Sequence, residues 1–259
     1  MTLHVVYRCA GVKNRKNRPA WFSKSLCLAS VLRSGEEHGD VGFTFLCDGP
    51  LPVEVHRVME GRGRVVELGG RGNSASYRAT VLEASRIGRG SDADVYVCED
   101  DYLHQPTALT ALGEAFRQTP AGAYLALYDH PDRHLRNDDM PVATAPATTT
   151  GDHEWRVVES TTMSFAARTR TLRRDLPVHY AVTFGRYPRD RLFWRTLQGL
   201  GYRRPLRLVL GRRLLYAARP GLAVHCEDEV LSPGVDWETL ATATRRWADQ
   251  RDLPLLETW

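Results

Sequence analysis

The residues with the clearest capacity for chemistry are Glu99, Asp100 and Asp101, which follow the apolar run of residues 95–98. Three adjacent carboxylates repel one another, whereas a divalent cation such as Mg²⁺ or Mn²⁺ takes hard oxygen ligands of this kind. The alternative is a solvated acidic loop, or the start of the helix that Pro106 begins. We interpret the cluster as a metal–phosphate site. Replacing Asp101 by Asn should then leave folding intact or slightly improved, because repulsion is relieved.

Other polar residues also follow predicted strands. Asp48 ends one apolar run, Asp129 and His130 end another, and a glycine-rich loop at 69–74 precedes a predicted helix. In α/β sheets, ligands bind beyond the carboxyl ends of the strands. We therefore expect these residues to lie at one edge. The loop could present backbone N–H groups to a phosphate or ribose, or it could be an ordinary capped turn.

The elements that must position these residues alternate between strand and helix through the first 130 residues. Predicted strands cover residues 3–9, 41–47, 64–68, 94–98 and 123–128, and predicted helices cover 19–35, a short segment after 53, 75–89 and 106–116. This alternation predicts an α/β domain with a mostly parallel central sheet flanked by helices. Further on, residues 155–167 indicate a strand pair, and residues 189–200 and 238–250 indicate helices.

Composition narrows the class of protein. The chain has 259 residues, is 42% hydrophobic and has a mean hydropathy of -0.38, which is typical of a globular domain with a substantial core. Apolar runs fall short of a membrane span and the N-terminus lacks a signal-peptide pattern, so we expect a cytoplasmic protein. The five cysteines are dispersed without CxxC spacing. They predict buried structural thiols rather than a disulfide framework or a zinc site.

Charge is unevenly distributed along the chain. Residues 168–219 hold 14 arginines and two acids, a net charge of +12, which leaves -8 for the rest. Such asymmetry suggests an anionic partner: nucleic acid, a phosphorylated small molecule or a phospholipid surface. The alternative is a solvated face. We see no interleaved pattern of exposed aromatic residues that would indicate base stacking, and therefore expect no nucleic-acid partner.

Several motifs occur in a fixed order along the chain. They are NRPAWFSK (17–24), VYVCEDDYLH (95–104), YDHPD (128–132), STTMSF (160–165), HCE (225–227) and LSPGVDW (231–237). Over roughly residues 3 to 237, this set resembles bacterial glycosyltransferases of the GT-A fold, which carry a DxD-type motif. The resemblance implies a single Rossmann-like domain, a nucleotide-diphosphate sugar donor, a small-molecule or glycan acceptor with a hydroxyl group, and Mn²⁺ or Mg²⁺ as cofactor.

The resemblance also implies roles for individual residues. It assigns metal binding to Glu99, Asp101 and His225, and substrate binding to Arg8, Asp48, Asn73, Ser74, Asp100, Asp129, His130, Thr161 and Thr162. His225 could instead be a structural histidine at a strand end. The acidic pair that supplies the base in inverting families has no match, so the stereochemical course stays open. Asp190 is our first candidate for the catalytic base, with an N-cap as its alternative role. Glu159 is the second, with an arginine partner as its alternative.

The predicted organisation is one domain over residues 1–237, followed by a helix and tail at 238–259. Residues 1–130 would form the nucleotide-sugar half, and residues 131–237 the acceptor half with a mobile loop at 136–152. Two other functions are open: a nucleotidyltransferase of related fold, and a basic nucleic-acid-binding module that uses Arg168–Arg219. The second leaves the acidic cluster unexplained, because carboxylates oppose a phosphate backbone.

Overall fold

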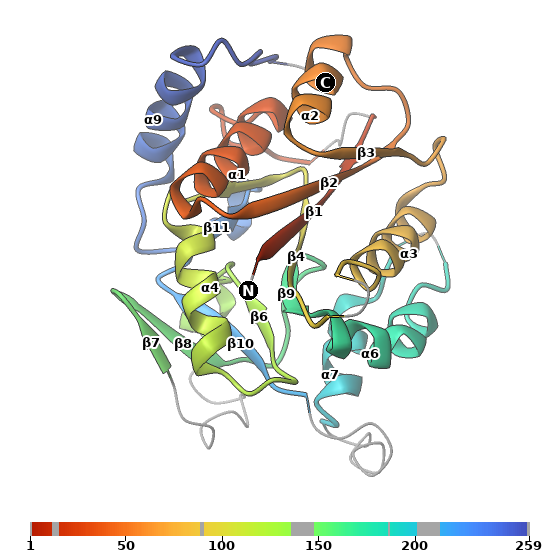
Figure 1. The fold of residues 1–259 in the computed structure, drawn as a ribbon. Helices are drawn as coiled ribbons and strands as arrows, with labels where there is room; N and C mark the ends of the chain where they lie inside the picture. Colours follow the sequence, from red (N-terminus) through yellow and green to blue (C-terminus); the bar gives the residue numbers. More distant parts are fainter. Residues whose placement is uncertain are drawn as a thin grey trace.

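The computed structural model describes residues 2–11, 16–88, 91–135, 148–185, 187–200 and 213–257. Its first half is a parallel sheet in the order β3-β2-β1-β4 (Figure 1). These strands are β1 (Leu3–Ala10), β2 (Val41–Asp48), β3 (Arg64–Glu67) and β4 (Asp94–Glu99). Ala10 lies beside Asp48, and Arg8 lies beside Glu99. The carboxyl ends of these strands therefore meet at one edge, as the alternation of elements predicts.

The second half makes the sheet mixed rather than mostly parallel. Its strands continue the order as β9-β6-β10-β8-β7. They are β6 (Tyr124–Ala126), β7 (Thr148–Thr150), β8 (His153–Val157), β9 (Phe165–Arg168) and β10 (Leu215–Arg219). β9 runs antiparallel to both β4 and β6, whereas β10 is parallel to β6. The described chain is thus a single α/β domain whose parallel core is extended by antiparallel strands.

The expected strand pair within residues 155–167 is wrong, although both segments are strands. β8 pairs with β10 and β7, while β9 is inserted between β4 and β6. The reason lies in the side chains. Phe165, Ala166 and Ala167 are all buried, which suits a central strand covered on both faces, whereas β8 mixes buried and exposed residues.

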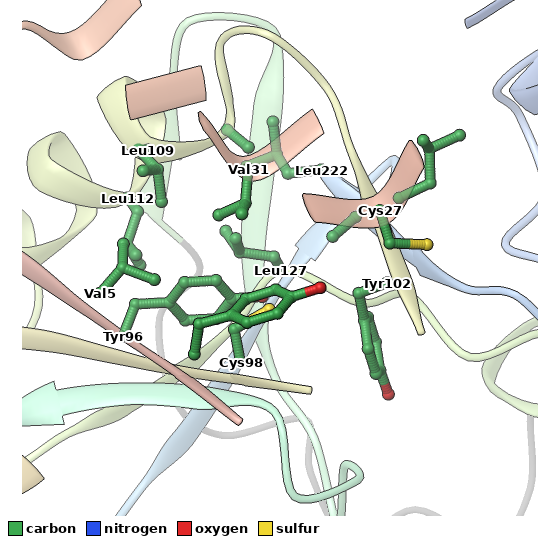
Figure 2. Close-up of a cluster of buried hydrophobic side chains, with 14 of the residues drawn as sticks. Val5, Cys27, Val31, Tyr96, Cys98, Tyr102, Leu109, Leu112, Leu127 and Leu222 are labelled. Atoms are coloured by element: carbon green, nitrogen blue, oxygen red, sulfur yellow. The ribbon is translucent and has the colours of Figure 1, made fainter. Parts of the chain in front are cut away.

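Helices cover both faces of the sheet (Figure 1). One face carries α1 (Lys24–His38), α4 (Ala108–Gln118) and α9 (Trp237–Asp249), and the other carries α3 (Asn73–Ala84), α6 (Thr169–Ala181) and α7 (Asp190–Leu197). The remaining helices are α2 (Val53–Arg62) and the short α5 (Asp132–Leu135). Two small strands, β5 (Tyr102–His104) and β11 (Ala223–His225), pair beside the main sheet. Figure 2 shows the core on the first face, where Val31 of α1 and Leu109 of α4 lie over Val5 and Tyr96 of the sheet.

Helix α1 extends past the stop that the sequence predicts at Ser34-Gly35. It begins after Ser23, whose side chain accepts a hydrogen bond from the Leu26 N–H at 3.2 Å, and it ends at Gly39, whose φ is 91°. A Cβ at Gly35 would lie 2.7 Å from the Phe43 ring. Gly35 is therefore a close-packing residue inside the helix rather than its terminator.

Three other expectations concern the chain as a whole. All five cysteines are free and buried, which confirms structural thiols. Within the described ranges, no helix combines the length and apolar character of a membrane span. Of the predicted loop at 136–152, residues 136–147 lie outside the described residues, whereas residues 148–150 form β7 rather than loop. Residues 201–212 of the arginine-rich stretch also lie outside the described residues.

Candidate functional site

The first two acids of the cluster are neutralised by cations from the N-terminal segment. Glu99 forms an ion pair with Arg8, which comes from the neighbouring strand β1. Asp100 Oδ2 lies 2.9 Å from Lys24 Nζ and accepts a hydrogen bond from the Ala10 N–H, also at 2.9 Å. Both predicted roles, metal binding for Glu99 and substrate binding for Asp100, therefore compete with these internal partners.

Asp101 is the most heavily engaged of the three. Its Oδ2 accepts hydrogen bonds from Arg18 Nη2 at 2.9 Å and from His225 Nε2 at 3.1 Å. Burial raises the pKa of Asp101, but His225 and Arg18 outweigh burial and hold that pKa well below its usual range. The repulsion among the three carboxylates is thus already reduced within the chain, since each has a cationic partner.

Asp101, His225 and Glu227 form a group whose side-chain donor atoms lie within 4.8 Å of one another. Asp101 Oδ1 is buried and has no hydrogen-bond partner among the described residues. Two carboxylates and an imidazole with a spare carboxylate oxygen fit a divalent cation. Glu99 is not part of this group, and Glu227 is a member that the sequence did not single out. Its signal was the spacing, because alternate residues leaving a strand point the same way.

His225 is held in an electrostatic environment that favours its charged form. Burial lowers the pKa of His225, but the carboxylates of Asp101 and Glu227 outweigh burial and raise it. Glu227 also forms an ion pair with Lys16. A cation bound by this group must displace the proton on His225 Nε2, so its affinity should depend on pH.

The glycine-rich loop is shaped by Asp48. The carboxylate of Asp48 accepts hydrogen bonds from the backbone N–H groups of Arg71 at 2.6 Å and Gly72 at 2.9 Å. Gly72 has a φ of 81° and immediately precedes α3. Asn73 Oδ1 accepts a hydrogen bond from Arg8 at 3.0 Å. Asp48 therefore orders the loop, and Asn73 is tied to the acidic cluster through Arg8.

Beside this edge lies a pocket of about 470 Å³. Its walls come from the segment after β6, the segment before β9, and α7. The lining residues are His130, Asp132, Arg133, Glu159, Ser160, Thr161, Thr162, Asp190, Arg191 and Arg195. Five residues that were predicted to act in catalysis or substrate binding thus share one cavity: His130, Glu159, Thr161, Thr162 and Asp190.

The two candidate bases in the pocket differ in their partners. Glu159 forms an ion pair with Arg195 and lies 3.6 Å from Arg191, which is the structural alternative foreseen for it. Asp190 has no ion-pair partner among the described residues, and burial raises its pKa. The N-cap position of α7 is Arg189, but the Asp190 carboxylate accepts a hydrogen bond from the first-turn N–H of Arg191 at 2.6 Å, which keeps part of the capping role foreseen for it. Asp190 therefore has the character of a base to a greater degree than Glu159.

His130 and its neighbour Asp129 have separate surroundings. Burial lowers the pKa of His130, and its Nδ1 accepts a hydrogen bond from the Asp132 N–H at 3.1 Å. The neutral ring thus carries its proton on Nε2. Asp129 is buried away from the pocket lining and pairs with His134 at 2.8 Å. Of the two, only His130 faces the cavity.

Tyr102 connects the acidic cluster to the pocket. Its ring stacks on His225 with centroids 5.0 Å apart and planes 11° from parallel. Its hydroxyl lies 2.6 Å from Thr162 Oγ1 in the pocket wall. Tyr102 is fully buried, so these contacts fix the distance between the two parts of the site.

The arginine-rich stretch is only partly described, and many of its described arginines have partners inside the chain. Arg168 donates to Phe116 O at 2.7 Å, Arg213 pairs with buried Asp175 at 3.1 Å, and Arg219 lies 2.8 Å from His134 Nδ1. Part of the positive charge is therefore used in folding rather than in binding a partner.

No protein-family model matches the chain, and no curated protein matches its sequence. Among solved structures it is similar to a nucleotidyl transferase from Methanothermobacter thermautotroptrophicus, at 15% identity over 95% of this chain and 99% of that one, with a TM-score of 0.47. It is similar to S. aureus TarS 1-349 in complex with UDP, at 11% identity over 84% of this chain and 60% of that one, with a TM-score of 0.48. It is also similar to CMP:2-keto-3-deoxy-manno-octonic acid synthetase complexed with CTP, at 14% identity over 96% and 100% of the two chains, with a TM-score of 0.45. Similarities at these low identities and TM-scores do not indicate which reaction the protein catalyses.

Proposed function

We propose that the protein is a metal-dependent glycosyltransferase that moves a sugar from a nucleotide-diphosphate sugar to a hydroxyl acceptor. The observation that carries the proposal is a pocket with a carboxylate base, Asp190, beside the carboxylate–imidazole group of Asp101, His225 and Glu227. The Asp190 carboxylate suits deprotonation of an acceptor hydroxyl, and the carboxylate–imidazole group with a bound cation suits an anionic leaving group.

The donor end rests on residues at the carboxyl edge of the parallel strands. Asp101, His225 and Glu227 would hold the divalent cation, which when bound neutralises charge that develops on the diphosphate. Arg18 and Lys16 already contact these carboxylates and add fixed positive charge at the same place. Backbone N–H groups at the start of α3 offer further donors to a phosphate or ribose.

The acceptor end rests on Asp190. In a single displacement, the acceptor oxygen bonds to the sugar carbon while the bond from that carbon to the diphosphate breaks, and the hydroxyl proton passes to the Asp190 carboxylate. His130 Nε2–H is available to donate a hydrogen bond, and Thr161 Oγ1 is a buried hydroxyl without a partner among the described residues. Both would orient the acceptor or the sugar within the pocket.

Product analysis tests this function. The purified protein is incubated with a panel of nucleotide-diphosphate sugars and simple hydroxyl acceptors, with Mn²⁺ or with a chelator. We expect a free nucleoside diphosphate to be released only when metal is present. Release of pyrophosphate from a nucleoside triphosphate and a sugar phosphate would instead establish the nucleotidyltransferase alternative and refute glycosyl transfer.

A further inference from the structure

The described surface exposes three aromatic side chains close together in sequence. Tyr180 at the end of α6 is 37% exposed, and Phe184 and Tyr187 in the connection to α7 are 77% and 58% exposed. The fourth large hydrophobic residue exposed in the described ranges is Val53, at 59%, which begins α2. Three exposed aromatic residues therefore occur in the arginine-rich stretch, for which we expected no interleaved aromatic pattern that would indicate base stacking. An exposed phenylalanine leaves a large apolar surface in water, which suggests a partner.

Exposed arginines precede and follow these aromatic residues along the chain. Exposed arginines recur at helical spacing on the outward face of α6, and further exposed arginines occur at the start of α7. The exposed arginines are Arg170, Arg173, Arg174, Arg189 and Arg191. The acids of the same described segment are turned elsewhere: Asp175 is buried against Arg213, and Asp190 lines the pocket. The α6–α7 tip, meaning these three aromatic residues and five arginines, thus presents no exposed carboxylate of its own.

We propose that the α6–α7 tip binds the surface of an anionic phospholipid bilayer. Tyrosine rings settle at the level of lipid headgroups, a phenylalanine inserts among the acyl chains, and arginines pair with lipid phosphates while their stems cover apolar surface. α6 and α7 lie at one end of the molecule, as Figure 1 shows. Binding through this end would leave α9, on the far side of the molecule, in water.

A bilayer fits the tip better than a nucleic acid does. A single strand of nucleic acid is bound in a basic groove that tracks successive phosphates. The pocket beside the tip is lined by the carboxylates of Asp190, Glu159 and Asp132 as well as by arginines, so it does not continue the tip as a basic groove. Arg191 belongs to both the tip and the pocket lining, so a bound membrane lies next to the pocket. The binding itself does not depend on the proposed transfer reaction.

Vesicle sedimentation tests the proposal with the full chain. The protein is mixed with vesicles of phosphatidylcholine alone, or with equal parts of phosphatidylcholine and phosphatidylglycerol, at low and at physiological salt. We expect binding to the anionic vesicles only, weakened by salt. Phe184→Ser should lower the partition coefficient about tenfold, and Arg170→Gln about fivefold. Val53→Ser and Arg57→Gln, on exposed residues of α2, are matched controls that should bind like the wild type.

Several outcomes would overturn the proposal. One is equal binding to neutral and anionic vesicles, and another is a loss in Val53→Ser as large as in Phe184→Ser. Binding of a single-stranded RNA oligonucleotide without vesicle binding would assign the tip to nucleic acid. Self-association that Phe184→Ser abolishes, again without vesicle binding, would assign it to a second copy of the chain. Thermal melts of each variant identify any effect that comes from unfolding.

Discussion

The acidic cluster at residues 99–101 and the pocket differ in how their carboxylates are compensated. In the cluster, every acid has a cation: Arg8 for Glu99, Lys24 for Asp100 and Arg18 for Asp101. In the pocket, Glu159 has arginine partners, whereas Asp190 has none among the described residues. A carboxylate that is paired with a cation contributes to stability in addition to any role in ligand binding, because removing it leaves the cation without a partner. Asp190, whose described partner is the backbone N–H of Arg191 rather than a cation, should contribute less to stability and take a proton more readily.

The sharpest test of this difference is Asp190→Asn. We expect the transfer rate to fall by about 10²–10⁴, as for loss of a general base, while the melting temperature stays the same or rises slightly. The reason for the second effect is that burial already disfavours the charge of Asp190. Glu159→Gln is the matched control, and it should lower stability because Arg195 and Arg191 lose their partner. Equal losses of activity in both variants would contradict the distinction between the two carboxylates.

Asp101→Asn should damage both function and stability. Loss of a group that faces the leaving charge predicts a rate lower by about 10²–10³. The free energy of unfolding should fall by about 2–4 kcal/mol, because Arg18 and His225 then face each other without the carboxylate between them. This reverses the sequence-based expectation of neutral or improved folding. Paired chemical denaturation and initial-rate measurements check it, and a variant as stable as the wild type would restore the original expectation.

Tyr102→Phe removes only the hydroxyl that joins the two regions. We expect kcat to fall about tenfold with little change in donor affinity, since Thr162 in the pocket wall loses its fixed partner. Stability should fall by about 1 kcal/mol. Tyr128→Phe is the control, because that hydroxyl donates to Val230 O at 2.6 Å instead. Identical kinetics for the two variants would show that the Tyr102–Thr162 contact does not position the pocket.

An effect that is small near neutral pH and grows as pH falls concerns two buried histidines that lie outside both regions. Burial lowers the pKa of His104 and of His179 to about 3, against 6.5 for an ordinary histidine. Between these values the unfolded chain binds more protons than the folded one, so stability falls as pH falls from about 6.5. Each histidine should add a slope of about 1.4 kcal/mol per pH unit. Denaturation of His179→Gln at pH 6 and below should show a shallower slope than the wild type, and an unchanged slope would refute this assignment.

The sequence predicted the fold well where local patterns decide it. The parallel strands and their helices appear because apolar runs end in turn residues, and the acids that follow them meet at one edge. The place of β9 could not be predicted, because its insertion between β4 and β6 depends on tertiary packing. The end of α1 was predicted wrongly for the same reason, because Gly35 is explained by its close packing against Phe43 and not by a helix end.

The residues of the candidate site could be predicted more readily than the ion pairs that they form. Sequence reasoning selected Asp190, Glu159 and His130, and the structure brings them to one pocket. It could not predict that cations of the N-terminal segment compensate the acidic cluster, because ion pairs between residues some 80 to 90 positions apart leave no local signal. The roles of the site residues remain predictions that the experiments above address.

We propose that Asp101, His225 and Glu227 bind a divalent cation that in turn binds the nucleoside diphosphate. Calorimetric titration of wild type and His225→Ala with nucleoside di- and triphosphates, with and without Mn²⁺, tests it most directly. We expect the wild type to bind a nucleoside diphosphate tightly only with Mn²⁺, and His225→Ala to weaken this binding about tenfold or more. Diphosphate binding of equal strength with and without metal, or unchanged in His225→Ala, would contradict it.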